Sequence, residues 1–209
     1  MIAYLCAIGI VALIYCLLAL GLNLQFGLTR LVNFGVVAFF AVGAYTSGLL
    51  ALQGVPLVLC FVAAAVLSGL LALPIGLLSL RLRDDYLAIV TLGFSEAVRI
   101  SIQQESWLTK GVQGLPGLPK LFASWGSGVS DMAIFATLLA VVAVVAWGTV
   151  RLAASPFGRL LKAIGDDEPA LSALGKDPAW FKVQVFMLGA ALAGVACLLY
   201  TSPSPRDKR

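Results

Sequence analysis

Long apolar stretches without a single charge constrain this chain more than any other feature of its sequence. Residues 1–22 contain no charged side chain, and residues 31–80 contain none either. An α-helix needs about 20 apolar residues to cross the roughly 30 Å hydrocarbon core of a bilayer. The stretches are continuously apolar rather than alternating, so they favour helices over the strands of a β-barrel. The sequence therefore predicts an all-α fold, a polytopic transmembrane helical bundle.

The overall composition excludes a soluble globular domain. Of the 209 residues, 61% are hydrophobic and 11% are charged, whereas a soluble domain carries about 25% charged residues. The net charge of +4 is small and falls between the apolar stretches, so we expect no nucleic-acid binding. Histidine is absent and the four cysteines lack a CxxC spacing, so we expect no bound metal and no other cofactor.

We expect about six spanning helices. Five segments have the length and apolar character of a membrane crossing: residues 2–22, 34–52, 55–80, 132–150 and 183–200. The sixth segment, residues 86–102, is shorter and carries Glu96 and Arg99. It either spans the membrane or forms a broken or re-entrant helix packed among the others.

The distribution of Lys and Arg between the expected loops predicts the orientation, because cytoplasmic loops of membrane proteins carry an excess of these residues. Alternation of the helices places residues 23–33, 81–85 and 151–182 on one side. Eight cations fall there: Arg30, Arg81, Arg83, Arg151, Arg159, Lys162, Lys176 and Lys182. The opposite side carries two, Lys110 and Lys120. We therefore expect the first side to be cytoplasmic and the N-terminus to face outward.

Residues 151–182 show more pattern than a simple connection between two spanning helices. Ser155 and Pro156 are typical of a helix N-cap followed by a first-turn proline. Gly165 and Asp166 are expected to end this first short helix. Before that end, the helix carries an apolar stripe: Leu160, Leu161 and Ile164.

A second short helix is expected over residues 168–174, closed by Gly175 in the C′ position. Two short amphipathic helices on the cytoplasmic side are typical of two kinds of surface. One is a docking surface for a soluble partner, and the other is an interfacial helix that lies on lipid headgroups. The residues alone leave both alternatives open.

Three blocks of the sequence resemble a known family: residues 21–50 (GLNLQFGLTRLVNFGVVAFFAVGAYTSGLL), 80–100 (LRLRDDYLAIVTLGFSEAVRI) and 155–175 (SPFGRLLKAIGDDEPALSALG). The third block is similar to the cytoplasmic coupling loop of ABC importer permeases. The chain resembles, over nearly all of residues 10–196, the branched-chain amino-acid permeases of the LivM type. The resemblance implies an ABC importer transmembrane permease domain.

The same resemblance implies a role for the loop. In these permeases a short cytoplasmic helix sits in a cleft of an ATPase and transmits its opening and closing to the membrane helices. Leu171 stands where the family usually has a second alanine. The implied ATPase-coupling residues are Gly158, Glu168, Ala170, Leu174 and Gly175.

The resemblance further implies partners and a location. The expected partners are a second permease subunit, cytoplasmic ABC ATPases, a periplasmic or lipid-anchored substrate-binding protein, and the lipid bilayer of a bacterial or archaeal cytoplasmic (inner) membrane. The chain contains no GxxxxGK[ST] loop that could bind phosphate, so we expect it to be no enzyme and ATP hydrolysis to belong to the ATPase. The implied function is import of branched-chain or related amino acids. Urea and short-amide permeases of the same family share similar blocks and remain an alternative.

Polar residues beside the apolar stretches are the candidates for a transport pathway. Asn23, Gln25 and Asn33 flank the first cytoplasmic turn, where amides either line a pathway or hydrogen-bond between helices. Glu96 and Arg99 are three residues apart, which predicts an ion pair on one helix face. An ATP-independent secondary carrier is the alternative function from another class, and Glu96 is the residue that could serve ion coupling in it.

The end of the chain departs from the family pattern. Residues 197–209 form a Pro/Ser/basic stretch where the family continues into further transmembrane segments. The peptide CLLYTSPSPRD resembles the translation of a sequencing-adapter sequence in one reading frame. We therefore expect an incomplete permease domain over residues 1–196, with the coupling loop at 151–182 inside it, and a non-native tail over residues 197–209.

Overall fold

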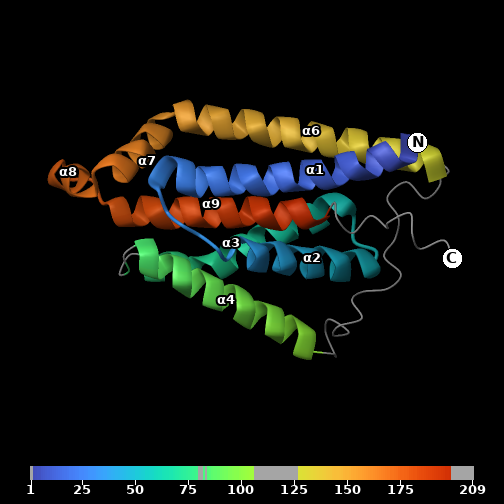
Figure 1. The fold of residues 1–209 in the computed structure, drawn as a ribbon, viewed down its shortest axis with the longest axis horizontal. Coiled ribbons are helices and arrows are strands. Elements are labelled where there is room, and N and C mark those ends of the chain that lie inside the picture. The colour runs from blue at the N-terminus through green and yellow to red at the C-terminus, as the bar shows by residue number, and fades with distance from the viewer. Residues whose placement is uncertain (1, 80–81, 83, 106–126, 199–209) are drawn as a thin grey trace.

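The fold is a bundle of helices (Figure 1). The computed structural model describes residues 2–79, 82, 84–105 and 127–198, and within these ranges it contains helices and no strand. The long helices are α1 (Ile2–Leu22), α2 (Val36–Leu52), α3 (Leu57–Ser79), α4 (Asp84–Gln104), α6 (Ser127–Ala154) and α9 (Pro178–Leu198). The short elements are the π-helix η1 (Asn23–Gly27), α7 (Pro156–Asp166) and α8 (Glu168–Ala173). The predicted all-α fold is confirmed.

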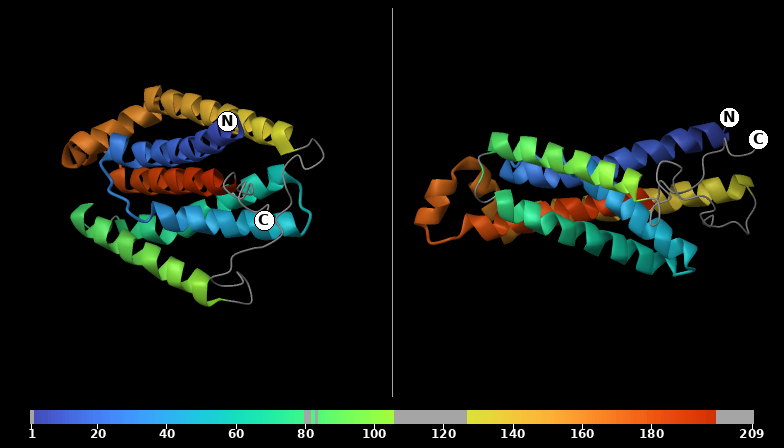
Figure 2. Two further views of the ribbon diagram at one scale, coloured as in Figure 1. Left: turned by 45° about the vertical axis from the view of Figure 1, so that its right-hand side comes forward. Right: turned by 90° about the horizontal axis from the view of Figure 1, so that it is seen from below.

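Helix α9 is the centre of the bundle. It packs against α1, α2 and α3, while α6 lies on the far side of α1 and α4 lies against α2 and α3. Figure 1 shows this order from α6 through α1 and α9 to α4. Both turned views in Figure 2 keep α7 and α8 at the end of the bundle away from the N-terminus. The loop between α6 and α9 therefore projects from one end of the molecule.

Four helical segments in the described part of the chain are long and apolar enough to cross a membrane: Tyr4–Gly27, Val58–Leu78, Met132–Ala154 and Pro178–Ala196. Helix α2 is apolar but shorter, with 17 residues. Helix α4 is one continuous helix of 21 residues, so the described residues do not support a broken helix at 86–102. The crossing of the membrane by α2 and α4 remains a prediction.

Helices α6 and α9 begin earlier than the apolar stretches indicate. Helix α9 begins at Pro178 rather than at residue 183, and the Asp177 carboxylate accepts a hydrogen bond from the Ala179 backbone N–H at 3.0 Å. Proline is favoured in the first turn of a helix and aspartate just before it. Hydropathy alone misses these polar first turns. The apolar stretches therefore predicted the positions of α6 and α9 but not their first residues.

Successive long helices run in opposite directions through the bundle, as the orientation prediction assumed. The C-terminal ends of α1 and α3 and the N-terminal ends of α4 and α9 lie at the same end of the bundle as α7 and α8 (Figure 1). Four of the cations counted for the orientation lie outside the described residues: Arg81, Arg83, Lys110 and Lys120. Residues 199–209 of the expected tail also lie outside them. The alternation of the helices is thus as predicted.

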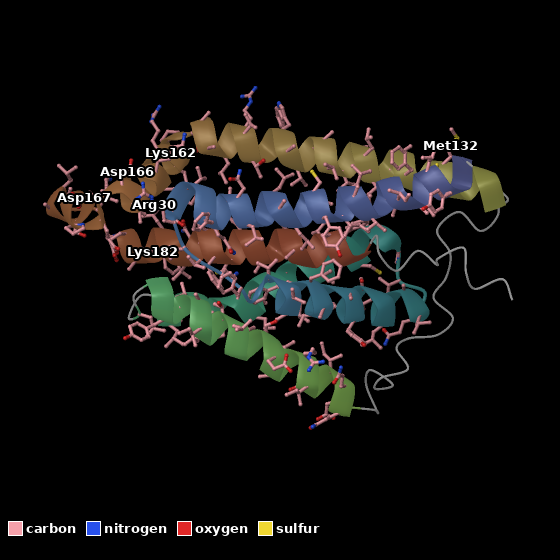
Figure 3. The ribbon with its side chains drawn as sticks, in the orientation of Figure 1. Arg30, Met132, Lys162, Asp166, Asp167 and Lys182 are labelled. Atoms are coloured by element: carbon pink, nitrogen blue, oxygen red, sulfur yellow. The ribbon has the colours of Figure 1, made fainter. Side chains whose placement is uncertain are left out.

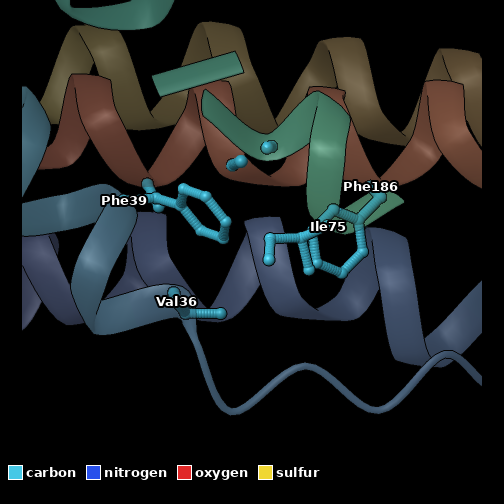
Figure 4. Close-up of a cluster of buried hydrophobic side chains, with 7 residues drawn as sticks. Val36, Phe39, Ile75 and Phe186 are labelled. Atoms are coloured by element: carbon cyan, nitrogen blue, oxygen red, sulfur yellow. The ribbon is translucent and has the colours of Figure 1, made fainter. Parts of the chain in front are cut away.

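An apolar cluster joins α2, α3 and α9 (Figure 4). The Phe39 and Phe186 rings meet edge-on, with centroids 6.0 Å apart, and Ile75 and Val36 lie in the same cluster. Close backbone contact brings α2 and α9 together beyond this cluster: a Cβ placed on Gly43 would lie 2.5 Å from the Gly194 Cα. Small residues permit such approach between transmembrane helices.

Candidate functional site

Helix α7 begins with the predicted cap. The Ser155 hydroxyl accepts a hydrogen bond from the Gly158 backbone N–H at 3.2 Å, and Pro156 occupies the first turn. A Cβ on Gly158 would overlap the carbonyl oxygens of Leu152 and Ala153 at the end of α6. The turn from α6 into α7 is therefore tight enough to require glycine at position 158.

The apolar face of α7 packs against protein. Leu161 is fully buried and Ile164 nearly so, in a cluster with Leu171 of α8 and Val185 of α9. Arg159 and Lys162 lie exposed on the other side of the helix. The predicted stripe is confirmed, and its burial argues against the alternative in which this face rests on lipid headgroups.

The break between α7 and α8 falls at Asp167, one residue later than predicted. Helix α7 continues through Gly165 and Asp166, and Asp167 has the extended backbone conformation φ −155°, ψ 96°. The Asp167 carboxylate then accepts from the Ala170 N–H at 3.1 Å and caps α8. The prediction treated Gly165 as a helix breaker. The structure instead uses Gly165 for packing, because a Cβ there would lie 2.9 Å from the Leu28 carbonyl oxygen.

Helix α8 ends in the predicted glycine motif. Gly175 has a left-handed backbone, with φ +75°. Its N–H donates to the Ser172 carbonyl at 3.0 Å, and the Lys176 N–H donates to the Leu171 carbonyl at 3.4 Å. These are the two hydrogen bonds of the Schellman motif, which satisfy the last carbonyls of a helix. Gly175 is therefore the C′ residue.

An ion pair that the sequence did not reveal ties α8 to α9. The Lys182 ammonium lies 2.6 Å from the Glu168 carboxylate, across 14 residues of chain. Lys182 is 12% exposed and Glu168 is 43% exposed. On sequence grounds Lys182 counted as one more cytoplasmic cation. The sequence has three consecutive acids here, Asp166, Asp167 and Glu168, and no local spacing identifies which of them pairs with Lys182.

The residues implied for ATPase coupling divide into an inner and an outer group. Gly158 is buried at the α6–α7 turn, and Glu168 points back to α9. Ala170, Leu174 and Gly175 are exposed, Leu174 to 78%. Helix α8 thus presents a small apolar tip at the extreme end of the molecule (Figure 1). The tip is held from behind by Leu171 and the Glu168–Lys182 pair.

The amide candidates near the first turn do not form one group. Asn23 is exposed, whereas Gln25 is fully buried and Asn33 nearly so. The Gln25 side-chain N–H donates to the Phe186 carbonyl of α9 at 3.0 Å, and the Asn33 amide donates to the Gln25 side-chain oxygen at 2.9 Å. Two of the three amides therefore hydrogen-bond between segments, which is one of the two roles expected of them. A pathway role for the three remains a prediction.

Glu96 and Arg99 form the predicted ion pair on α4. The Arg99 Nε lies 3.0 Å from one Glu96 carboxylate oxygen, and both side chains are more than half exposed. This ion pair and the Gln25–Asn33 hydrogen bond share no residue. Among the described residues no group of three or more Cys, Asp and Glu side chains could hold a metal ion.

Comparison with known families identifies the chain. Residues 4–204 match the family described as branched-chain amino acid transport system / permease component. The chain belongs to this family. Together with its apolar helices, this membership makes the chain a multi-pass protein of the cytoplasmic membrane.

Curated relatives agree with the family. The chain is 37% identical over 219 residues to the high-affinity branched-chain amino acid transport system permease protein LivM of Salmonella typhimurium, and 36% identical to that of Escherichia coli. Each match covers 93% of this chain and 52% of the relative, so the chain spans about half the length of these proteins. A probable branched-chain amino acid transport permease protein LivM of Methanocaldococcus jannaschii is 25% identical, over 90% of this chain and 64% of that protein. No solved structure matches the chain significantly.

Proposed function

We propose that this chain is part of the transmembrane permease subunit of an ABC importer that moves branched-chain or related amino acids into the cell. ATP hydrolysis is carried out by a partner ATPase. The proposal is supported by the family membership and by the names of the relatives from Salmonella typhimurium and Escherichia coli. A second permease subunit and a substrate-binding protein complete the proposed transporter.

The arrangement of α7 and α8 is the observation that carries the coupling role. Helix α8 projects beyond the bundle with Ala170 and Leu174 exposed, which suits insertion into a cleft of a soluble partner. Behind the tip, Leu171 and the Glu168–Lys182 pair fix α8 to α9. A force applied to the tip therefore reaches a helix at the centre of the bundle.

Helix α7 gives the same loop a second attachment. Its buried face contacts α9 through Val185, and Gly165 lies directly against the backbone after η1. Coupling between distant sites travels through packed side chains and rigid elements. The two short helices thus act as one lever with contacts on α9 and on the segment directly after η1.

The secondary-carrier alternative finds no support in the geometry of Glu96. This carboxylate is paired with Arg99 on an exposed face of α4. An acid that exchanges ions within a transport cycle is expected inside the bundle or along a water-filled cavity. Family membership favours the ABC permease over that alternative.

Two substitutions in the loop test the proposal in proteoliposomes that contain the complete transporter. Glu168→Arg places a second cation beside Lys182, and Gly175→Pro removes the left-handed backbone that ends α8. We expect both variants to insert and assemble, to hydrolyse ATP, and to import substrate about ten-fold more slowly. Uptake at the wild-type rate in either variant would rule out the coupling role.

Gly54→Pro is the matched control for Gly175→Pro. Gly54 also has a left-handed backbone, with φ +78°, but it lies in the turn between α2 and α3 at the opposite end of the bundle. We expect this control to lower the amount of folded protein without changing the ATP hydrolysed per molecule imported. An equal change of that ratio in both variants would mean that the loop has no special role.

A further inference from the structure

A π-helix interrupts the chain where α1 meets the connection to α2. Residues Asn23–Gly27 form this single turn. π-Helical residues make up well under 1% of soluble proteins and often mark functional sites. The turn lies at the end of the bundle that carries α7 and α8 (Figure 1).

Gln25, at the middle of this turn, is the buried hub of a hydrogen-bond network. Its side-chain N–H donates to the Phe186 carbonyl of α9 at 3.0 Å, and its side-chain oxygen accepts from the Asn33 amide at 2.9 Å. Its backbone carbonyl accepts from the Thr29 hydroxyl at 2.6 Å. Helix α9 makes room for the amide at Gly189, because a Cβ there would overlap the Gln25 side chain.

The residue after Asn33 is hydrogen-bonded to α4. The Asn33 side-chain oxygen accepts from the Gly35 N–H at 2.8 Å, and the Phe34 N–H donates to the Thr91 hydroxyl of α4 at 3.1 Å. Every buried side-chain polar atom in the described part of the chain has a hydrogen-bond partner. A fully satisfied buried network fixes one arrangement of the segments that it joins.

The segment directly after this turn touches the lever. Gly165 of α7 packs on the backbone of Leu28 and Thr29, with a hypothetical Cβ 2.9 Å from the Leu28 carbonyl oxygen. The next residue, Asp166, lies 3.5 Å from the Arg30 guanidinium. Figure 3 labels both side chains, which lie at the end of the bundle that carries α7. Arg30 is the one non-glycine residue in the described ranges with a left-handed backbone, at φ +56°. Such a conformation persists only where its surroundings hold it.

We propose that Gln25 is a positioning residue that gives the α7–α8 lever a second link to α9, beside its direct contacts with that helix, and a link towards α4. This inference rests on the proposed function of the loop. Displacement of α7 moves Leu28 and Thr29. The Gln25 amide transmits that movement to α9 and, through Asn33 and the adjacent Phe34, to α4. Without the amide, the lever keeps its direct contacts with α9 and loses this second route.

Gln25→Met tests the inference, because methionine keeps the length of the side chain and removes its hydrogen bonds. In the complete transporter in proteoliposomes, we expect ATP hydrolysis to continue while import of a branched-chain amino acid falls about ten-fold. The number of ATP molecules hydrolysed per molecule imported rises accordingly. A merely structural role would lower both rates in proportion to the folded protein and would overturn the inference, as would import at the wild-type rate.

Gly189→Ala disturbs the Gln25 amide by a change on α9 rather than at Gln25 itself. The added Cβ displaces Gln25 from the Phe186 carbonyl, so we expect the same rise in ATP hydrolysed per molecule imported. Gly69→Ala is the matched control, because its Cβ would lie no closer than 3.6 Å to α9. A ratio that changes equally in both glycine variants contradicts the role of Gln25.

Hydrogen exchange on the unsubstituted transporter keeps the inference testable if these variants fail to fold. Exchange of backbone amides over residues 23–35 should differ between the nucleotide-free and ATP-bound transporter. Identical exchange in both states overturns the role of Gln25. The Glu168→Arg and Gly175→Pro results are independent of this outcome, so failure here is distinguishable from failure of the proposed function.

Discussion

The Lys182 ammonium lies 2.6 Å from the Glu168 carboxylate and joins the first residue of α8 to the second turn of α9. The pair closes the base of the two-helix lever, while the tip of α8 stays exposed beyond it (Figure 3). Lys182 is largely buried, so loss of its partner leaves a cation with poor access to water. The contact therefore fixes the angle at which α8 leaves the bundle.

Reversing one charge of this pair should uncouple the transporter, and reversing both should restore it. We expect Glu168→Lys to raise the ATP hydrolysed per molecule imported about ten-fold, because two cations repel each other at the base of α8. The double variant Glu168→Lys/Lys182→Glu recovers the attraction. Parallel measurements of ATP hydrolysis and uptake in proteoliposomes check both expectations.

Glu96→Lys/Arg99→Glu is the control for the double reversal. This pair lies on α4, outside the α7–α8 loop, so the control shows whether reversal of any ion pair disturbs coupling. We expect the control to leave the ratio of ATP to substrate unchanged. If the double variant at positions 168 and 182 stays as uncoupled as the single variant, the ion pair does not hold α8 in its coupling position.

The sequence was sufficient to predict the helices because burial in lipid demands long apolar stretches. It located α1 with the observed bounds and predicted the Ser155 cap and the Gly175 terminus, since each depends on residues that are neighbours in the chain. It also predicted the Glu96–Arg99 pair, for the same reason. Local spacing determines all of these features.

Contacts between distant segments could not be predicted. The Gln25–Phe186 hydrogen bond joins residues 161 positions apart, and Glu168 reaches Lys182 only because α8 folds back towards α9. Gly165 was interpreted as a helix breaker because its packing partner lies after η1. In each case the tertiary arrangement, and not local propensity, decides the role of the residue.

Gly165→Ala should destabilise the contact between α7 and the η1 connection. The added Cβ would lie 2.9 Å from the Leu28 carbonyl oxygen, so the two backbones must separate. We expect a loss of about 1–3 kcal/mol of unfolding free energy, the usual cost of overpacking. Thermal unfolding in detergent measures this change as a lower Tm.

Gly148→Ala provides the comparison for that measurement. Gly148 lies inside α6, where a Cβ would meet nothing within 4 Å. Alanine is favoured over glycine in a helix, so we expect an unchanged or slightly higher Tm. An equal fall of Tm in both variants would show that Gly165 does not form a special contact.

The crossing of α2 and α9 should be sensitive to added volume. A Cβ on Gly43 would lie 2.5 Å from the Gly194 Cα, and Ser68 of α3 fills the space beside Gly194. Gly43→Val must therefore separate α2 from α9, with an expected loss of about 3 kcal/mol. The fraction of folded, detergent-stable protein on size-exclusion chromatography checks this outcome, and a wild-type elution profile and Tm would contradict it.

Because Gly175 has a left-handed backbone, alanine and asparagine at this position should affect the end of α8 differently. Gly175→Ala keeps the space open but disfavours φ +75°, at a cost of about 1–2 kcal/mol, whereas asparagine adopts this conformation more readily. We expect faster hydrogen exchange of the Gly175→Ala variant at the last turn of α8, and exchange close to wild type for Gly175→Asn. Because nothing lies within 4 Å of the added Cβ, a steric clash does not explain the difference. Equal exchange in the two variants would mean that the Schellman hydrogen bonds do not hold the end of α8.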